Sequence, residues 1–94
     1  MNNSVQNSAT KPHNIILEGR SKMVLSGVND VVVFEENNVE LKTTKGDLTI
    51  RGSLMKMESF LSDTGDLIMG GNIYAIVYVN DASQKQGFWG RLFK

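Results

Sequence analysis

The stretch that decides the fold is VELKTTKGDLTIRG, residues 39–52. Apolar positions alternate with charged ones over residues 39–42, and with polar or charged ones over residues 48–51. A period of two places one set of side chains on each face of a strand. Between the two runs lies Lys45-Gly46-Asp47, whose glycine can take the positive φ of a tight turn. The stretch therefore predicts a β-hairpin with one apolar face.

Further strands are predicted on both sides of this hairpin. The runs Val31–Phe34 and Ile73–Val79 are apolar throughout and rich in β-branched and aromatic residues. Such runs are typical of strands that are covered on both faces, or that lie at an oligomer contact. Residues Ser53–Ser62 fit a strand better than a helix, because Glu58 would interrupt the helical apolar stripe.

Turn signals and glycines divide the chain at short intervals. Turns are expected at Glu36-Asn37-Asn38 and at Asp63-Thr64-Gly65-Asp66, and bends or bulges at strand-end glycines. These glycines are Gly27, Gly52, Gly70 and Gly71. The pattern predicts one small all-β domain of about eight short, mostly antiparallel strands, arranged as a sandwich, barrel or roll. We expect a disordered polar tail at residues 1–13, the β domain at 14–80, and a linker with an aromatic and basic tail at 81–94.

Composition excludes several function classes. The 94 residues suit one domain, and ten Lys and Arg balance ten Asp and Glu, which argues against a general nucleic-acid binder. The chain has no cysteine, so disulfides, thiolate metal sites and cysteine nucleophiles are absent. No signal peptide is expected, and the apolar run at residues 73–79 is too short to cross a bilayer.

The titratable residues do not form a recognisable reaction centre. His13 is the only histidine and is expected to be solvated, next to the polar tail. Glu35 and Glu36 would point to opposite faces of a strand, while Asp63 and Asp66 are typical turn residues. No phosphate-binding loop, dinucleotide motif or nucleophile elbow occurs. We therefore expect no catalytic, cofactor-binding or metal-binding residues, no cofactor, and no enzymatic activity.

The C-terminal segment is the most suggestive part of the chain for binding. After Gln84 it carries three basic residues and no acid, so the chain up to Gln84 carries a net charge of −3. Tyr74 and Tyr78 are four apart on a predicted strand and should share a face. We expect the tail to dock on a protein partner or on its own sheet, with contact to a membrane surface as the second option. The predicted interaction residues are Ile73, Tyr74, Tyr78, Phe88, Trp89, Arg91, Leu92 and Phe93.

Several of these stretches resemble the YabP/YqfC family of sporulation proteins. The resemblance covers residues 12–79, and the terminal Gly87–Phe93 is more similar to the YabP branch than to the YqfC branch. The family pattern consists of aliphatic positions and glycines and contains no catalytic signature. The stretches that carry it are HNIILEGR (13–20), LSGVNDV (25–31), FE (34–35), VELKT (39–43), GDLTIRG (46–52), TGDLIMGGNI (64–73) and Tyr78.

The resemblance implies a role in endospore formation, in the mother-cell cytoplasm and at the forespore surface. Taken with the residue chemistry, it leads us to expect a non-enzymatic, β-rich scaffold or assembly module that acts through protein contacts. Its partner would be an unidentified protein or a second copy of the chain, and no nucleic acid is expected. Two alternatives are a peripheral membrane adaptor held by the C-terminal tail, and a β-barrel that binds a small ligand or nucleic acid.

Overall fold

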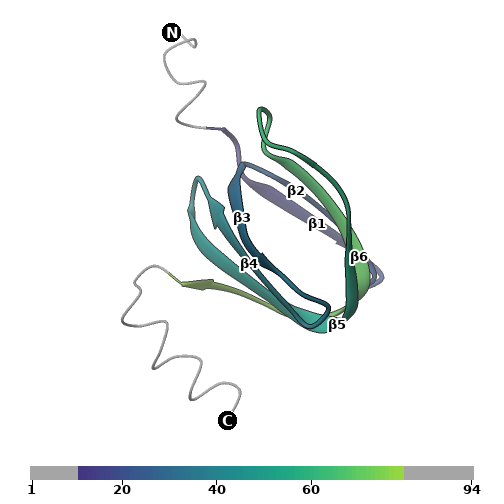
Figure 1. Cartoon of the computed structure of the whole chain (residues 1–94). Coiled ribbons are helices and arrows are strands. Elements are labelled where there is room, and N and C mark those ends of the chain that lie inside the picture. The colour runs from purple at the N-terminus through teal and green to yellow at the C-terminus, as the bar shows by residue number, and fades with distance from the viewer. Residues whose placement is uncertain (1–10, 80–94) are drawn as a thin grey trace, which may run out of the picture.

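The predicted all-β class is confirmed. The structure is a computed structural model that describes residues 11–79, in which six strands form one antiparallel sheet (Figure 1). The order across the sheet is β1-β2-β6-β5-β4-β3. The strands are β1 (Asn14–Glu18), β2 (Lys22–Ser26), β3 (Val28–Phe34), β4 (Asn38–Thr43), β5 (Gly46–Leu61) and β6 (Asp66–Val79).

The number of strands differs from the prediction because two pairs of expected strands are continuous. The strand expected at Ser53–Ser62 exists, but it extends the strand that begins at Gly46, which gives a β5 of 16 residues. In the same way, the runs on both sides of Gly70-Gly71 join into a β6 of 14 residues. Gly52, Gly70 and Gly71 therefore lie inside long strands, and of the four glycines expected at strand ends only Gly27 marks a boundary, between β2 and β3.

The β5–β6 hairpin bends in the region of Gly52 and Gly71. Its register shifts between Arg51 and Gly52 and again between Ser53 and Lys56, and shifts of this kind mark β-bulges that bend a sheet. Gly71 has a φ of 142° and Leu54 a φ of 54°. The bend divides the sheet into two halves, with β1 and β2 in one and β3 and β4 in the other, and Figure 1 shows these halves facing each other.

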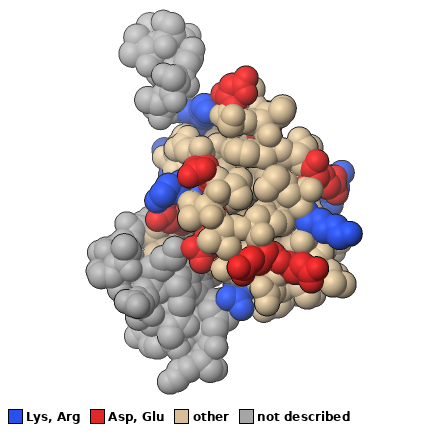
Figure 2. Space-filling model, in the orientation of Figure 1, with Lys and Arg blue, Asp and Glu red and all other residues tan. Residues whose placement is uncertain are grey.

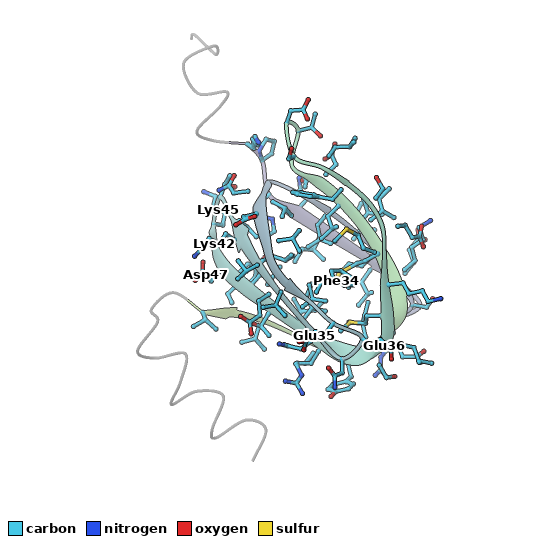
Figure 3. All side chains as sticks on the ribbon, viewed as in Figure 1. Phe34, Glu35, Glu36, Lys42, Lys45 and Asp47 are labelled. Atoms are coloured by element: carbon cyan, nitrogen blue, oxygen red, sulfur yellow. The ribbon has the colours of Figure 1, made fainter. Side chains whose placement is uncertain are left out.

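The hydrophobic core lies between the two halves of the bent sheet. Every second residue of the strands turns to this side, and the residues at these positions are apolar. Phe34, Phe60 and Ile76 are half-buried and pack against the core, and Figure 3 shows Phe34 within this space. The fully buried residues of the cluster are Met23, Leu25, Val28, Val39, Leu41, Leu48, Ile50, Met55, Leu67, Met69 and Ile73.

Of the two alternatives for Val31–Phe34, coverage on both faces does not occur within residues 11–79, and a position at an oligomer contact stays a prediction. These residues belong to β3, which is the last strand of the sheet, and the Val32 side chain is 50% exposed. Two backbone hydrogen bonds fix the start of β3, from Val28 N to Gly65 O at 3.0 Å and from Thr44 N to Gly27 O at 3.0 Å. β3 is thus held at its start, and within residues 11–79 no strand pairs with its outer side.

Candidate functional site

The sheet has two terminal strands, and their outer edges differ. Among residues 11–79, β1 pairs only with β2, and β3 pairs only with β4. The β3–β4 ladder has two register shifts, and such irregularities protect an edge from pairing with another strand. The β1–β2 ladder runs through five consecutive residue pairs without a shift. β1 is therefore the terminal strand whose geometry suits the addition of a further strand.

The side chains of β1 offer little protection against strand addition, since Glu18 at its end is its one charged residue. The strand contains no Lys, Arg or Pro, the residues that commonly block an open edge. Its outward face presents Asn14, Ile16 and Glu18, and Ile16 is 56% exposed. Its inward face presents Ile15 and Leu17, which are half-buried and pack against the core. An added strand would cover apolar side chains on both faces.

The backbone direction of β1 follows from two hydrogen bonds. Asn14 N donates to Ser26 Oγ at 3.0 Å, and Glu18 O accepts from Ser21 N at 2.9 Å, so both residues turn toward β2. Backbone groups along an antiparallel strand point alternately to its two sides. The N–H and C=O groups of Ile15 and Leu17 therefore point to the open edge.

The loop between β1 and β2 is fixed to the bend of β6. Gly19 and Arg20 both have a φ of 57°, a conformation that costs a non-glycine residue about 1 kcal/mol or more. Arg20 Nε donates to Ile73 O at 3.0 Å, and Ile73 N donates to Arg20 O at 2.9 Å. Gly71 N donates to Ser21 O at 3.0 Å. These contacts hold β1 in a defined position, which reduces the entropy cost of binding at its edge.

Surface grooves lie beside β1. One has a volume of about 260 Å³ and runs between Leu17 of β1 and the second half of β6. The other has a volume of about 330 Å³ and is lined by residues of β1 and β2, and by Asp66 of β6. Both are open at the surface, which suits an extended segment rather than an enclosed ligand. The residues lining the first groove are Leu17, Arg20, Ile73, Tyr74, Ala75 and Ile76.

A pair of rings joins the start of β1 to the end of β6. His13 Nδ1 lies 2.8 Å from Ser26 O, and His13 Nε2 lies 2.6 Å from the hydroxyl oxygen of Tyr78. The ring centroids are 5.7 Å apart with planes at 86°, an edge-to-face contact. His13 is half-buried, so the expectation that it is solvated is wrong. Burial raises the pKa of the Tyr78 hydroxyl above its ordinary value of 10.0.

Residues 11–13, which the sequence assigned to the N-terminal tail, contact the sheet. Lys11 O accepts a hydrogen bond from Thr44 Oγ1 at 2.8 Å, and Pro12 O accepts one from Ser26 Oγ at 3.0 Å. With His13 they form a short connection that leads directly into β1. This connection fixes the N-terminal end of the open edge, as the loop at Arg20 fixes the other end.

The predicted interaction residues divide into three groups. Ile73 is 2% exposed and belongs to the core, where it forms the floor of the first groove. Tyr74 and Tyr78 are exposed by 57% and 45%, but Tyr74 has no Cα partner in the β5–β6 register, so the alternation that would give them one face is interrupted. The remaining five lie outside the described residues: Phe88, Trp89, Arg91, Leu92 and Phe93.

Sequence reasoning missed β1 as a candidate surface. The run Ile15-Ile16-Leu17 is short, and its apolar pattern does not reveal whether its neighbours in the sheet lie on one side or on both. The position of β1 at the end of the sheet follows from the pairing of β2 with β6, between residues more than forty positions apart. The absence of Lys, Arg and Pro from these five residues was the one signal that the sequence offered.

Charged side chains are dispersed over the described part of the molecule. Figure 2 shows acidic and basic residues interspersed on the visible face. Lys22 and Glu58 form an exposed ion pair at 3.9 Å, and Lys42 and Asp47 form another at 3.5 Å. In Figure 3, Lys42 and Asp47 lie at the β4–β5 hairpin, away from Glu35 and Glu36 at the β3–β4 turn. Within residues 11–79, no group of three or more His, Asp or Glu side chains is placed to hold a metal ion.

No helix with the length and apolar character needed to span a membrane occurs in residues 11–79.

The fold and its open edge define a class of small, single-sheet β proteins. The model of the YabP family matches residues 9–85, and the chain belongs to this family. The chain is also similar to the spore protein YabP of Bacillus subtilis (strain 168), with 28% identity over 89 residues that cover 93% of this chain and 89% of that protein. The YabP family is a family of sporulation proteins and not a known enzyme family, and membership supports a role in spore formation.

Proposed function

We propose that the protein is a non-enzymatic assembly module of spore formation that acts in the mother cell, at the forespore surface, through protein contacts. The observation that carries this proposal is the regular edge of β1, which contains no Lys, Arg or Pro and whose free-side backbone groups belong to Ile15 and Leu17. An extended segment that adds to a sheet edge gains affinity from main-chain hydrogen bonds and specificity from alternate side chains. Family membership supports the role in spore formation, and the open edge supports strand addition as the mode of action.

The grooves beside β1 support the same mode of binding. An added strand would place alternate side chains toward the 260 Å³ groove at Leu17 and the 330 Å³ groove at Ile16. The interior between the sheet halves is filled by buried aliphatic and methionine side chains. A surface that binds an extended protein segment therefore fits this geometry better than a barrel that encloses a small ligand.

The test compares two single substitutions at exposed positions of the two terminal strands. Ile16→Lys places a charge on the outward face of the β1 edge, and Val32→Lys places the same charge on β3. Both side chains are at least half exposed, at 56% and 50%, so both variants should fold. Each variant replaces the native protein in a spore-forming host, and heat-resistant spores are counted at equal protein levels.

We expect Ile16→Lys to reduce spore formation to the level of the deletion strain, and Val32→Lys to keep it near the wild-type level. The reason is that an edge lysine must lose hydration when a strand is added beside it. Normal spore numbers with Ile16→Lys, or equal losses with both variants, would contradict the proposal. A parallel circular dichroism spectrum of each purified variant separates loss of binding from loss of folding.

A further inference from the structure

We propose that the β1 edge pairs with β1 of a second copy of the chain, antiparallel and about a two-fold axis at Ile16. This inference rests on the proposed function, because it names the partner of the same edge. Closed two-fold dimers are the commonest oligomers, and their interface must be complementary to itself. β1 meets this condition in three respects: its backbone hydrogen-bonding groups, the side chains on its two faces, and the position of its one charged residue, Glu18.

The backbone fixes the possible registers. The backbone groups that point to the open edge belong to Ile15 and Leu17. A partner strand must therefore align these two residues with residues whose own backbone groups point to its open edge. A two-fold axis at Ile16 aligns Ile15 with Leu17 of the second copy, and Leu17 with Ile15 of the second copy. Each of these two pairs exchanges two N–H···O=C bonds, which gives four hydrogen bonds. An axis at Ile15 or at Leu17 would pair only three of the five residues of β1.

The side chains on the outward face complement each other in the same register. Ile16 lies opposite Ile16 of the second copy, so the 56% of its surface that is exposed becomes partly covered. Asn14 lies opposite Glu18 of the second copy, where its amide can donate to the carboxylate. Glu18 is the one charged residue of the strand, and in this register it faces an amide instead of a second carboxylate.

The side chains on the inward face extend the core across the axis. Ile15 and Leu17 are half-buried in the single chain and pack against the buried cluster. In the dimer Ile15 lies beside Leu17 of the second copy, and Leu17 beside its Ile15, so both form apolar cross-strand pairs. Small β domains bury a limited fraction of their surface, and this pairing would enlarge the buried apolar area. β3 offers no equivalent, because its ladder shifts twice and Asp30 is exposed on it.

A cysteine at the two-fold axis tests the register directly. The chain contains no cysteine, so Ile16→Cys provides one thiol per copy. In this register residue 16 forms a non-hydrogen-bonded pair, with Cα atoms about 4.5 Å apart, and a disulfide accepts Cα separations of about 4.4–6.8 Å. We expect the Ile16→Cys protein to become a covalent dimer in a glutathione redox buffer, while the control Val32→Cys stays monomeric.

Sedimentation of the full chain provides the second measurement. The wild type should approach twice the monomer mass of 10.4 kDa as its concentration rises, and so should Val32→Lys. Ile16→Lys should remain a monomer at the same concentrations, with an unchanged circular dichroism spectrum. The short interface predicts a dimer at the weak end of specific association, so the concentration series is essential.

Two outcomes would overturn the dimer. One is a wild type that stays monomeric throughout the series, and the other is Ile16→Cys that cross-links no more than Val32→Cys. In either case the spore counts decide the proposed function separately. A defect in Ile16→Lys alone would then show that the edge binds a different protein, and normal spore numbers would remove both proposals.

Discussion

The imidazole of His13 and the hydroxyl of Tyr78 form a hydrogen bond of 2.6 Å, although the two residues are 65 positions apart in the chain. The carbonyl oxygen of Ser26 can only accept, so His13 Nδ1 carries the proton that bonds to it at 2.8 Å. Nε2 of the neutral ring is then the acceptor for the Tyr78 hydroxyl. These two hydrogen bonds connect the start of β1, the end of β2 and the end of β6, and they hold the two halves of the sheet together beside the open edge.

The first prediction concerns the stability that the hydrogen bond between His13 and Tyr78 provides. Tyr78→Phe removes the hydroxyl and leaves His13 Nε2 without its partner, and we expect the free energy of unfolding to fall by about 0.5–1 kcal/mol. The value lies at the low end because Tyr78 is 45% exposed and water can replace the lost bond. Urea unfolding measures the change. Tyr74→Phe is the matched control, and a double-mutant cycle with His13→Ala should show coupling only for Tyr78.

The second prediction concerns alkaline pH. Burial raises the pKa of Tyr78 in the folded protein, so the folded state holds this proton more tightly than the unfolded state does. The resulting stabilisation is complete below the ordinary pKa of 10.0 and is lost as pH rises toward the higher folded value. The stability difference between wild type and Tyr78→Phe should therefore shrink above about pH 10. A difference that grows with pH in this window would contradict the prediction, and tyrosinate absorbance reports the titration directly.

The sequence predicted the local structure well because that structure depends on neighbouring residues. The hairpin of residues 39–52 forms as β4 and the start of β5, and the choice of strand for Ser53–Ser62 is confirmed. The alternation of apolar and polar residues is enough for both results, because it records which side of a strand faces the core. The same alternation cannot record where a strand lies in the sheet.

The parts that could not be predicted all depend on contacts between distant segments. The local pattern predicts a strand end at Gly52, yet β5 continues through it because a neighbouring strand, β6, bends with it. The local pattern predicts a solvated His13, since it does not reveal the partners Ser26 and Tyr78, which are 13 and 65 residues away. The open edge of β1 likewise follows from the topology. The local pattern thus predicts the strands, while the candidate site depends on how the strands are arranged in the sheet.

The third prediction concerns the bend of the β5–β6 hairpin. A Cβ atom at Gly52 would overlap the carbonyl oxygen of Asn72, and one at Gly71 would lie 2.7 Å from the Cα of Met55. Both obstacles are backbone atoms of the adjacent strand, which cannot move without breaking the ladder. We therefore expect Gly52→Ala to lower the free energy of unfolding by about 3 kcal/mol or more, or to prevent folding.

Gly19→Ala is the control for the bend. Gly19 also has a positive φ, of 57°, but the nearest atom to an added Cβ is Ser21 Oγ at 3.8 Å. Its cost should therefore be the conformational cost alone, about 1 kcal/mol. Denaturant unfolding of both variants measures the difference. Equal losses at the two positions would show that close packing at the bend is not what requires Gly52.

The fourth prediction concerns Leu54, which lies at the bend with a φ of 54° and with 64% of its side chain exposed. A leucine in this conformation is strained and buries little apolar surface in return. Leu54→Gly should therefore raise the free energy of unfolding by about 0.5–1 kcal/mol, measured from the urea midpoint and slope. Met57→Gly is the control, because Met57 is also exposed, at 39%, but has no positive φ, and glycine there should destabilise the strand. A loss of stability in Leu54→Gly would show that the leucine makes contacts that outweigh its backbone strain.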